Sequence, residues 1–141
     1  MSKIAVVYWS GTGNTEAMAN FVAEGATGAG AEAEVIPCAD FSADKAAEYD
    51  AFAFGCPAMG SEVLEEMDFQ PMFDACKNML SGKRVALFGS FGWGDGQWMR
   101  DWESDCSNAG ISLTCESVTC CETPDDTALA ACREMGKALA G

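Results

Sequence analysis

The feature that most restricts the fold is an apolar run that passes directly into a glycine-rich turn and then into a helical pattern. Residues 3–9 are almost continuously apolar and rich in β-branched and aromatic side chains, which is typical of a strand buried on both faces of a parallel sheet. From residue 14 to residue 28, apolar side chains recur at helical spacing. The turn between them has the sequence Ser-Gly-Thr-Gly-Asn-Thr. This strand, turn and helix predict the first unit of an alternating α/β fold.

The same alternation continues to the end of the chain. Further strands are predicted over residues 34–36, 51–56, 85–89 and 111–119, and further helices over residues 41–48, 69–82, 95–109 and from residue 123 onward. This order predicts a doubly wound, five-stranded parallel sheet with strand order 2-1-3-4-5, helices on both faces and right-handed crossovers. No linker or low-complexity segment divides the 141 residues, so residues 1–141 are expected to form a single domain.

The turn after the first strand has the composition of an anion-binding site. A helix N-terminus carries N–H groups without intrahelical partners and a partial positive charge, and Ser10, Thr12, Asn14 and Thr15 add side-chain donors. The Gly-Lys-Ser/Thr tail of a nucleoside triphosphate loop is missing, and Glu16 stands where a dinucleotide fingerprint has its third glycine. A phosphate monoester therefore fits best. The alternative is a turn that only caps the helix.

Two later loops leave the carboxyl ends of predicted strands at the same edge of the sheet. They place the large side chains of Met59 and Trp93 beside glycines, where a surface turn is usually polar. We expect these two side chains to enclose a flat aromatic heterocycle whose phosphate tail lies on the first loop. A simpler interpretation makes Trp93 an anchor of its own loop and Met59 a filler of the core.

Charge and hydropathy exclude several classes of function. The formal net charge of −14 argues against nucleic acids and anionic membranes as ligands and favours partners with basic faces, although acidity also serves solubility alone. No apolar run approaches the length of about 20 residues that crosses a bilayer, and the N-terminus has no basic-then-apolar signal pattern. A cytoplasmic protein is expected.

The eight cysteines are expected to be reduced, mostly buried thiols, because no export signal accompanies them. The chain has no histidine and no C-x-x-C pair, which argues against zinc and iron–sulfur sites. The adjacent Cys120 and Cys121 are interpreted either as a redox dithiol or as two residues at the end of a strand.

Three segments resemble the flavin-binding segments of the short-chain flavodoxins, particularly those of anaerobic bacteria. These segments are WSGTGNTE at residues 9–16, GCPAMGSE at residues 55–62 and LFGSFGWG at residues 87–94. The resemblance covers nearly the whole chain and lacks the insertion in strand five that marks the long-chain group. It implies a flavodoxin-like fold, non-covalent FMN and a monomeric, low-potential one-electron carrier between redox enzymes, with no turnover of its own.

The resemblance also implies a role for individual residues. The turn at residues 10–15 would hold the phosphate with Ser90 close by, Met59 would cover the inner flavin face and Trp93 the outer face. Gly60 would turn its carbonyl toward flavin N5 when that atom is protonated, which stabilises the neutral semiquinone, and Glu62 would accept a hydrogen bond from N3–H. Cys121 stands where related chains often carry asparagine.

The full set of expected FMN-binding residues is Ser10, Gly11, Thr12, Gly13, Asn14, Thr15, Pro57, Ala58, Met59, Gly60, Ser61, Glu62, Ser90, Phe91, Gly92, Trp93 and Gly94. No catalytic or metal-binding residue is expected.

Two other functions compete with electron carriage. An FMN-dependent NAD(P)H or quinone reductase would need a second substrate pocket, for which 141 residues leave little material, and Trp93 would cover the face that a hydride donor approaches. A binding module that uses the acidic surface without a flavin is the third candidate.

Overall fold

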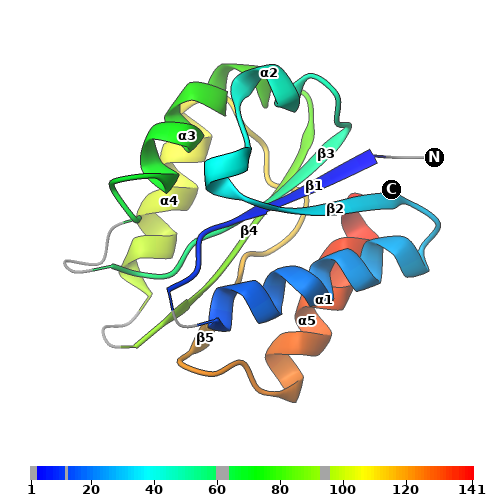
Figure 1. Cartoon of the computed structure of the whole chain (residues 1–141), viewed down its shortest axis with the longest axis vertical. Helices are drawn as coiled ribbons and strands as arrows, with labels where there is room; N and C mark the ends of the chain where they lie inside the picture. The colour runs from blue at the N-terminus through cyan, green and yellow to red at the C-terminus, as the bar shows by residue number, and fades with distance from the viewer. Residues whose placement is uncertain (1–2, 12, 60–63, 93–95) are drawn as a thin grey trace.

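A computed structural model describes residues 3–11, 13–59, 64–92 and 96–141. Its elements in chain order are β1 (Lys3–Tyr8), α1 (Asn14–Gly28), β2 (Glu32–Pro37), a 3₁₀ turn (Cys38–Asp40), α2 (Ala43–Ala46), β3 (Ala51–Gly55), α3 (Phe69–Cys76), a second 3₁₀ turn (Lys77–Met79), β4 (Arg84–Phe91), α4 (Gln97–Asn108), β5 (Val118–Cys121) and α5 (Asp126–Leu139). The strands form one parallel sheet in the order β2-β1-β3-β4-β5, which confirms the predicted topology (Figure 1).

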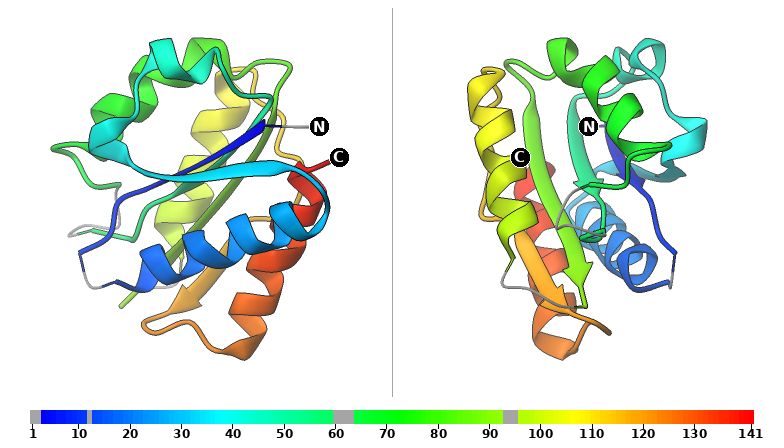
Figure 2. Two further views of the ribbon diagram at one scale, coloured as in Figure 1. Left: turned by 45° about the vertical axis from the view of Figure 1, so that its right-hand side comes forward. Right: turned by 90° about the vertical axis from the view of Figure 1, so that its left-hand side faces the viewer.

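The sheet separates two layers of helices. Helices α1 and α5 cover one face, and α2, α3 and α4 cover the other (Figures 1 and 2). Side chains alternate between these layers along each central strand, so Phe52 and Phe54 of β3 face one layer while Ala51 and Ala53 face the other. Because both faces are covered, all five residues of β3 are buried. This double covering explains the uninterrupted apolar runs in the sequence.

Helices α1 and α5 approach each other at two glycines. A Cβ atom added to Gly25 would collide with the backbone carbonyl of Arg133, and one added to Gly136 would collide with the backbone carbonyl of Val22. The two helices are therefore in backbone contact at this level, as Figure 2 illustrates by their side-by-side course. Only residues without a side chain permit this distance.

The last strand is shorter than the sequence predicts, and this prediction was wrong over most of residues 111–119. Leu113 makes a single bridge to Val85, but regular pairing with β4 begins only at Val118, opposite Phe88. The segment between these pairs is two residues longer than the stretch of β4 beside it, so it leaves the ladder. The Ser117 hydroxyl donates to Glu103 Oε2 of α4 at 2.7 Å, which holds this excursion away from the sheet.

The predicted helix over residues 69–82 also ends early. Regular α-helix stops at Cys76, and one 3₁₀ turn over Lys77–Met79 continues the chain in the same direction. Phe69, Met72, Phe73 and Cys76 form the buried stripe that was predicted, and Leu80 is buried beyond the helix. The apolar spacing therefore predicted the buried face of α3 correctly, but it did not predict where the α-helix ends.

The cysteines of the described chain are all free thiols, and five of the eight are buried. Cys120 faces inward, with its Sγ 3.7 Å from Met18 Sδ, whereas Cys121 is exposed. Adjacent residues of a strand point to opposite faces of the sheet, so these two thiols do not face each other. This geometry favours the interpretation as strand-end residues over that as a redox dithiol. Within the described ranges, no helix is both long and apolar enough to span a bilayer.

Candidate cofactor site

The turn between β1 and α1 is curled around the start of the helix. Gly13, at the N-cap, has φ 94° and therefore lies in the left-handed region that favours glycine. Its backbone N–H donates to Ser10 Oγ at 3.0 Å, which draws the serine across the turn. The first helical hydrogen bond runs from Ala17 N–H to the carbonyl of Gly13. The N–H groups of the residues between them precede the helical ladder, so they remain available to an anion.

The second element of this site comes from the end of β4. Thr15 and Ser90 are both buried, and their hydroxyl oxygens lie 3.4 Å apart although 75 positions separate them in the chain. A hydroxyl both donates and accepts, so this pair satisfies itself and still has hydrogen-bonding capacity toward a bound group. The start of α1 and the end of β4 therefore meet at this point.

An acidic side chain stands near this turn, and its contact holds it to β1. The Tyr8 hydroxyl donates to Glu16 Oε2 at 3.0 Å. Burial first, and then this hydrogen bond, raise the pKa of Tyr8, so the hydroxyl keeps its proton for the carboxylate. The contact ties Glu16 to the tyrosine rather than leaving it free to swing over the helix N-terminus.

Beside the turn lies a cavity of about 380 Å³, within the range of small-molecule sites. It is lined by Trp9, Gly11, Asn14, Pro57, Ala58, Met59, Ser90, Phe91, Gly92 and Glu122. Eight of these ten residues belong to the set expected from the sequence. Three separate loops thus contribute to one hollow, with an apolar part formed by aromatic, proline and methionine side chains and a polar part at the turn.

The cavity walls are fixed to the sheet. Ala58 N–H donates to the carbonyl of Ser90 at 3.0 Å, which joins the loop after β3 to the end of β4. Behind the cavity, the Trp98 Nε1–H group donates to the carbonyl of Cys56 at 3.2 Å, and the rings of Trp98 and Phe91 lie 5.4 Å apart. A buried tryptophan from α4 therefore supports the two loops.

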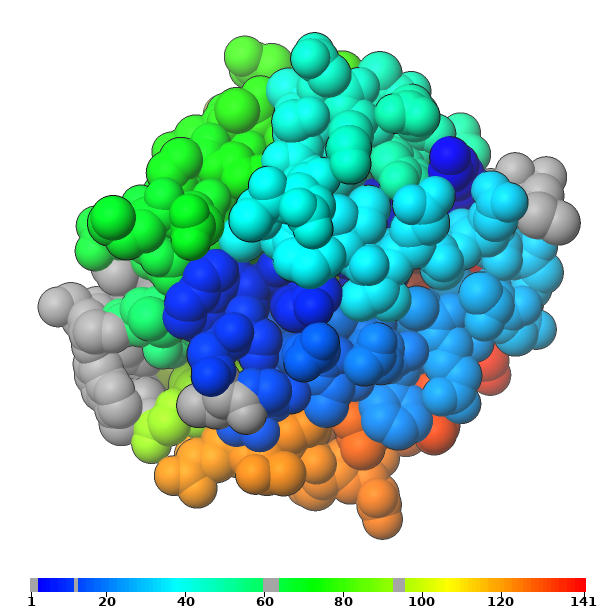
Figure 3. Space-filling model, in the orientation of Figure 1, coloured from blue at the N-terminus to red at the C-terminus, as the bar shows by residue number. Residues whose placement is uncertain are grey.

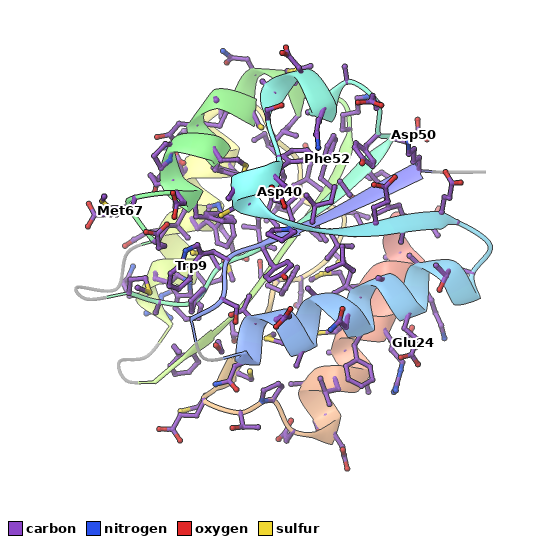
Figure 4. All side chains as sticks on the ribbon, viewed as in Figure 1. Trp9, Glu24, Asp40, Asp50, Phe52 and Met67 are labelled. Carbon is purple, nitrogen blue, oxygen red and sulfur yellow. The ribbon has the colours of Figure 1, made fainter. Side chains whose placement is uncertain are left out.

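Two residues that line the cavity were missed at the sequence level. Trp9 was assigned to the end of the first strand, and Figure 4 shows it beyond β1. Glu122 follows β5 with φ 59°, a left-handed conformation that glycine or asparagine usually supplies. Its N–H donates to the Phe91 carbonyl at 2.7 Å, which fixes it beside the β4 loop. Glu122, rather than the neighbouring Cys121, therefore completes this wall, a role that its place after the last strand would have suggested.

Several expected contacts lie outside the described residues. These are Thr12 in the turn, Gly60, Ser61 and Glu62 after Met59, and Trp93 and Gly94 after Gly92. Their roles stay predictions, including the Gly60 switch and the stacking of Trp93.

A larger hollow, of about 830 Å³, lies between β5 and α5, but it includes none of the expected residues. Of these two hollows, the smaller one is the one that adjoins the N-terminus of α1. Figure 3 shows this end of α1, in blue, next to the orange surface of the β5–α5 region. In the part of the chain described here, no group of three or more Cys, Asp or Glu side chains is placed to hold a metal ion.

The residues present fit FMN. An anion-binding turn with hydroxyl donors suits its single phosphate, and the adjoining apolar cavity suits a flat heterocycle. Fold and site together define a small α/β cofactor-binding protein whose ligand lies at the topological switch point of its sheet.

Comparison with known proteins identifies the family. The family model described as "Flavodoxin" matches residues 6–136. The chain is 44% identical over 135 residues to the flavodoxin of Clostridium beijerinckii, covering 96% of this chain and 97% of the relative. It is 42% identical over 137 residues to the flavodoxin of Megasphaera elsdenii, covering 97% and 98%. The solution structure of the two-electron reduced M. elsdenii flavodoxin superposes with a TM-score of 0.89 over 97% of this chain and 98% of that one.

The chain therefore belongs to the flavodoxin family, in its short-chain form. It is an FMN-containing electron carrier rather than an enzyme.

Proposed function

We propose that the chain carries single electrons at low potential, as one domain and as a monomer in the cytoplasm, with FMN held between the three loops. The observation that supports this most strongly is the junction of an anion-binding turn with an apolar cavity at one end of the sheet. FMN supplies the one-electron chemistry when bound. The protein binds its phosphate, orients its ring and excludes water from it.

At the phosphate end, residues 10–15 and Ser90 supply hydrogen bonds rather than positive charge. Within the described residues, the cavity lining includes no lysine or arginine. The binding energy therefore comes from N–H groups of the first turn of α1 and from the hydroxyls of Ser10, Thr15 and Ser90. A carrier that holds a dianionic group this way adds no local cation that would raise the reduction potential of the ring.

At the ring end, Met59 and Trp93 are proposed to enclose the two faces, with Gly60 and Glu62 at the ring edge. Added negative charge on the ring is costly in an apolar site of an acidic protein, because nearby carboxylates repel it. Glu122, an acidic residue, is among those that line the cavity. A low second reduction potential follows from this arrangement.

Titration of the apoprotein with FMN and with riboflavin tests the phosphate site. Riboflavin lacks the phosphate, so it should bind at least tenfold more weakly, and Thr15→Val should narrow this difference because one donor is lost. Equal affinities for the two flavins would contradict the assignment of residues 10–15.

Flavodoxins exchange electrons with redox proteins, and we propose that the partners of this one present basic faces. The net charge of −14 supports this, since opposite charges steer association. Electron transfer from the reduced protein to a basic c-type cytochrome should slow as sodium chloride is raised from about 20 to about 300 mM, because salt shortens the range of attraction between surface charges, to about 10 Å at 0.1 M. A rate that rises with salt would argue against basic partners.

A further inference from the structure

Cys56, three residues before Met59, makes hydrogen bonds both to the sheet and to the residue that leads into α3. Cys56 is buried at the end of β3, and its N–H donates to the Phe88 carbonyl at 3.2 Å. At the far end of the segment, the N–H of Glu65 donates to Cys56 Sγ at 3.3 Å. The Cys56 thiol thus joins the end of β3 directly to Glu65, the residue that leads into α3.

Glu65 itself is held by an unusually complete set of donors. The residue is only 6% exposed, and it is the one buried acidic residue of the described chain. Its carboxylate accepts three backbone hydrogen bonds of 2.8 Å: Met67 N–H donates to Oε2, while Asp68 N–H and Phe69 N–H donate to Oε1. Burying a carboxylate without partners is costly, and these three donors offset that cost.

These donors belong to the start of α3. Asp68 occupies the N-cap of this helix, yet its own side chain makes no capping hydrogen bond. Glu65 supplies the cap instead, and its carbonyl also accepts the N–H of Gln70 at 2.8 Å. Burial alone would raise the pKa of Glu65, but the three N–H groups lower it below its ordinary value, so the residue stays ionised at neutral pH.

We propose that Glu65 is a positioning residue for the cofactor, which fixes the wall containing Met59 by tying the start of α3, through Cys56, to the end of β3. It does not contact FMN. A simple helix cap would need no link to Cys56 and no burial of the whole side chain, whereas both are present. The inference rests on the proposed function in one respect, the placement of Met59 against the ring.

The test compares Glu65→Gln with Glu66→Gln. Both changes remove one negative charge at neighbouring positions, but Glu66 is exposed. In the FMN-loaded proteins, the two reduction potentials are measured by spectroelectrochemical titration, and FMN affinity is measured on the apoproteins. We expect Glu65→Gln to weaken FMN binding about tenfold and to change the separation of the two potentials, because a neutral amide holds the three donors less strongly. Glu66→Gln should change affinity less than about twofold.

A second pair of variants keeps the proposal testable if Glu65→Gln folds poorly. Cys56→Ser retains an acceptor for the Glu65 N–H, whereas Cys56→Ala removes it. We expect Cys56→Ala to shift affinity and potentials in the direction of Glu65→Gln, and Cys56→Ser to restore them toward the parent values. Equal behaviour of the serine and alanine variants would overturn the link through the thiol.

Unchanged potentials and affinity in Glu65→Gln, with only a lower unfolding temperature, would reduce Glu65 to a helix cap and overturn the inference. Met59→Ala separates this failure from that of the proposed function. If Met59→Ala moves the potentials but Glu65→Gln does not, only the positioning role is wrong. If neither moves them, the placement of Met59 against the ring is wrong as well.

Discussion

The two faces of the sheet are packed by different means. The face under α2, α3 and α4 is filled with aromatic rings, such as Phe54 and Phe73, whose centroids lie 5.1 Å apart at nearly right angles. The face under α1 and α5 is filled mainly with alanine and other aliphatic side chains, with Phe88 as the one fully buried ring among its described residues, and its two helices touch at Gly25 and Gly136. Large aromatic rings fill the first layer, whereas in the second layer the glycines, which have no side chain, allow α1 and α5 to come into backbone contact.

This difference matches the two ends of the cofactor cavity. Trp9 and Phe91, on the apolar wall, pack against the aromatic layer. The anion-binding turn instead leads into α1, the helix of the closely packed layer. We therefore expect aromatic packing to hold the apolar wall of the cavity rigid, and backbone contact between α1 and α5 to hold the turn before α1.

The largest effect is expected from removing a ring in the aromatic layer. Phe54→Ala should destabilise the protein by about 3–5 kcal/mol, because Phe54 is fully buried among other rings and its removal leaves a cavity in the core. Urea unfolding measures this. Phe21→Ala, on the opposite layer, is the control: its half-buried ring lies under the Arg133 guanidinium at 4.5 Å, and its loss should cost about 1 kcal/mol. Equal costs would remove the contrast between the layers.

The close contact of α1 and α5 is tested by adding one carbon atom. Gly136→Ala should cost about 1–3 kcal/mol or more, because the new Cβ meets the Val22 carbonyl and the helices must separate. Gly28→Ala adds the same atom at the end of α1, where nothing lies within 4 Å, and should be neutral or stabilising by up to about 1 kcal/mol. The unfolding temperatures of both variants measure this difference. An unchanged unfolding temperature in Gly136→Ala would show that α1 and α5 are loosely packed against each other.

Two tryptophans of α4 allow a finer test within the aromatic layer. Trp98 donates its Nε1–H to Cys56, whereas Nε1 of Trp102 has no hydrogen-bond partner among the described residues. Both are buried, so Trp→Phe leaves a similar void at each site. Trp102→Phe should be the milder change by about 1 kcal/mol, because it removes an unsatisfied donor rather than a hydrogen bond. The reverse order in urea unfolding would mean that Trp102 is satisfied in solution.

The smallest effects concern one buried thiol from each layer. Burial raises the pKa of Cys106 and of Cys132 from 9.0 to about 12, with Asp105 adding to the effect at Cys106. The folded state keeps these protons when the unfolded state has released them, so their stabilisation is complete below pH 9 and is lost as pH rises from 9 toward 12. Urea midpoints measured from pH 8 to pH 10.5 should therefore fall, and less steeply in Cys106→Ala and in Cys132→Ala. Cys121→Ser, at an exposed site, should leave the slope unchanged.

The sequence predicted the elements that follow a simple period. Helix α1 has the predicted bounds, because apolar spacing, a glycine-rich start and closing glycines agree there. The strand predicted over residues 111–119 was largely wrong, because alternation of Ile111, Leu113 and Cys115 continues past the point where the chain leaves β4. Alternation reports which side chains turn inward, but not whether the backbone still pairs with a neighbour.

The site was predictable to the extent that it consists of loops at strand ends. Strand order alone brings the loops after β1, β3 and β4 together, and eight of the eleven described members of the expected set line the cavity there. The link between Glu65 and Cys56 was not predictable, because it depends on how α3 begins in space. The left-handed conformation of Glu122 was equally hidden, since glutamate does not favour it.

The glycine contact between α1 and α5 also affects the position of the N-terminal end of α1. Gly25 lies eleven residues beyond Asn14, or about 16 Å along a helix that rises 1.5 Å per residue. A tilt of α1 by about 5° at Gly25 would move the N-terminus of the helix sideways by roughly 1.4 Å, which is more than the length of a hydrogen bond can vary. The direction of the α1 N-terminus, where we propose that the phosphate binds, is thus set by a glycine contact about 16 Å away along the helix.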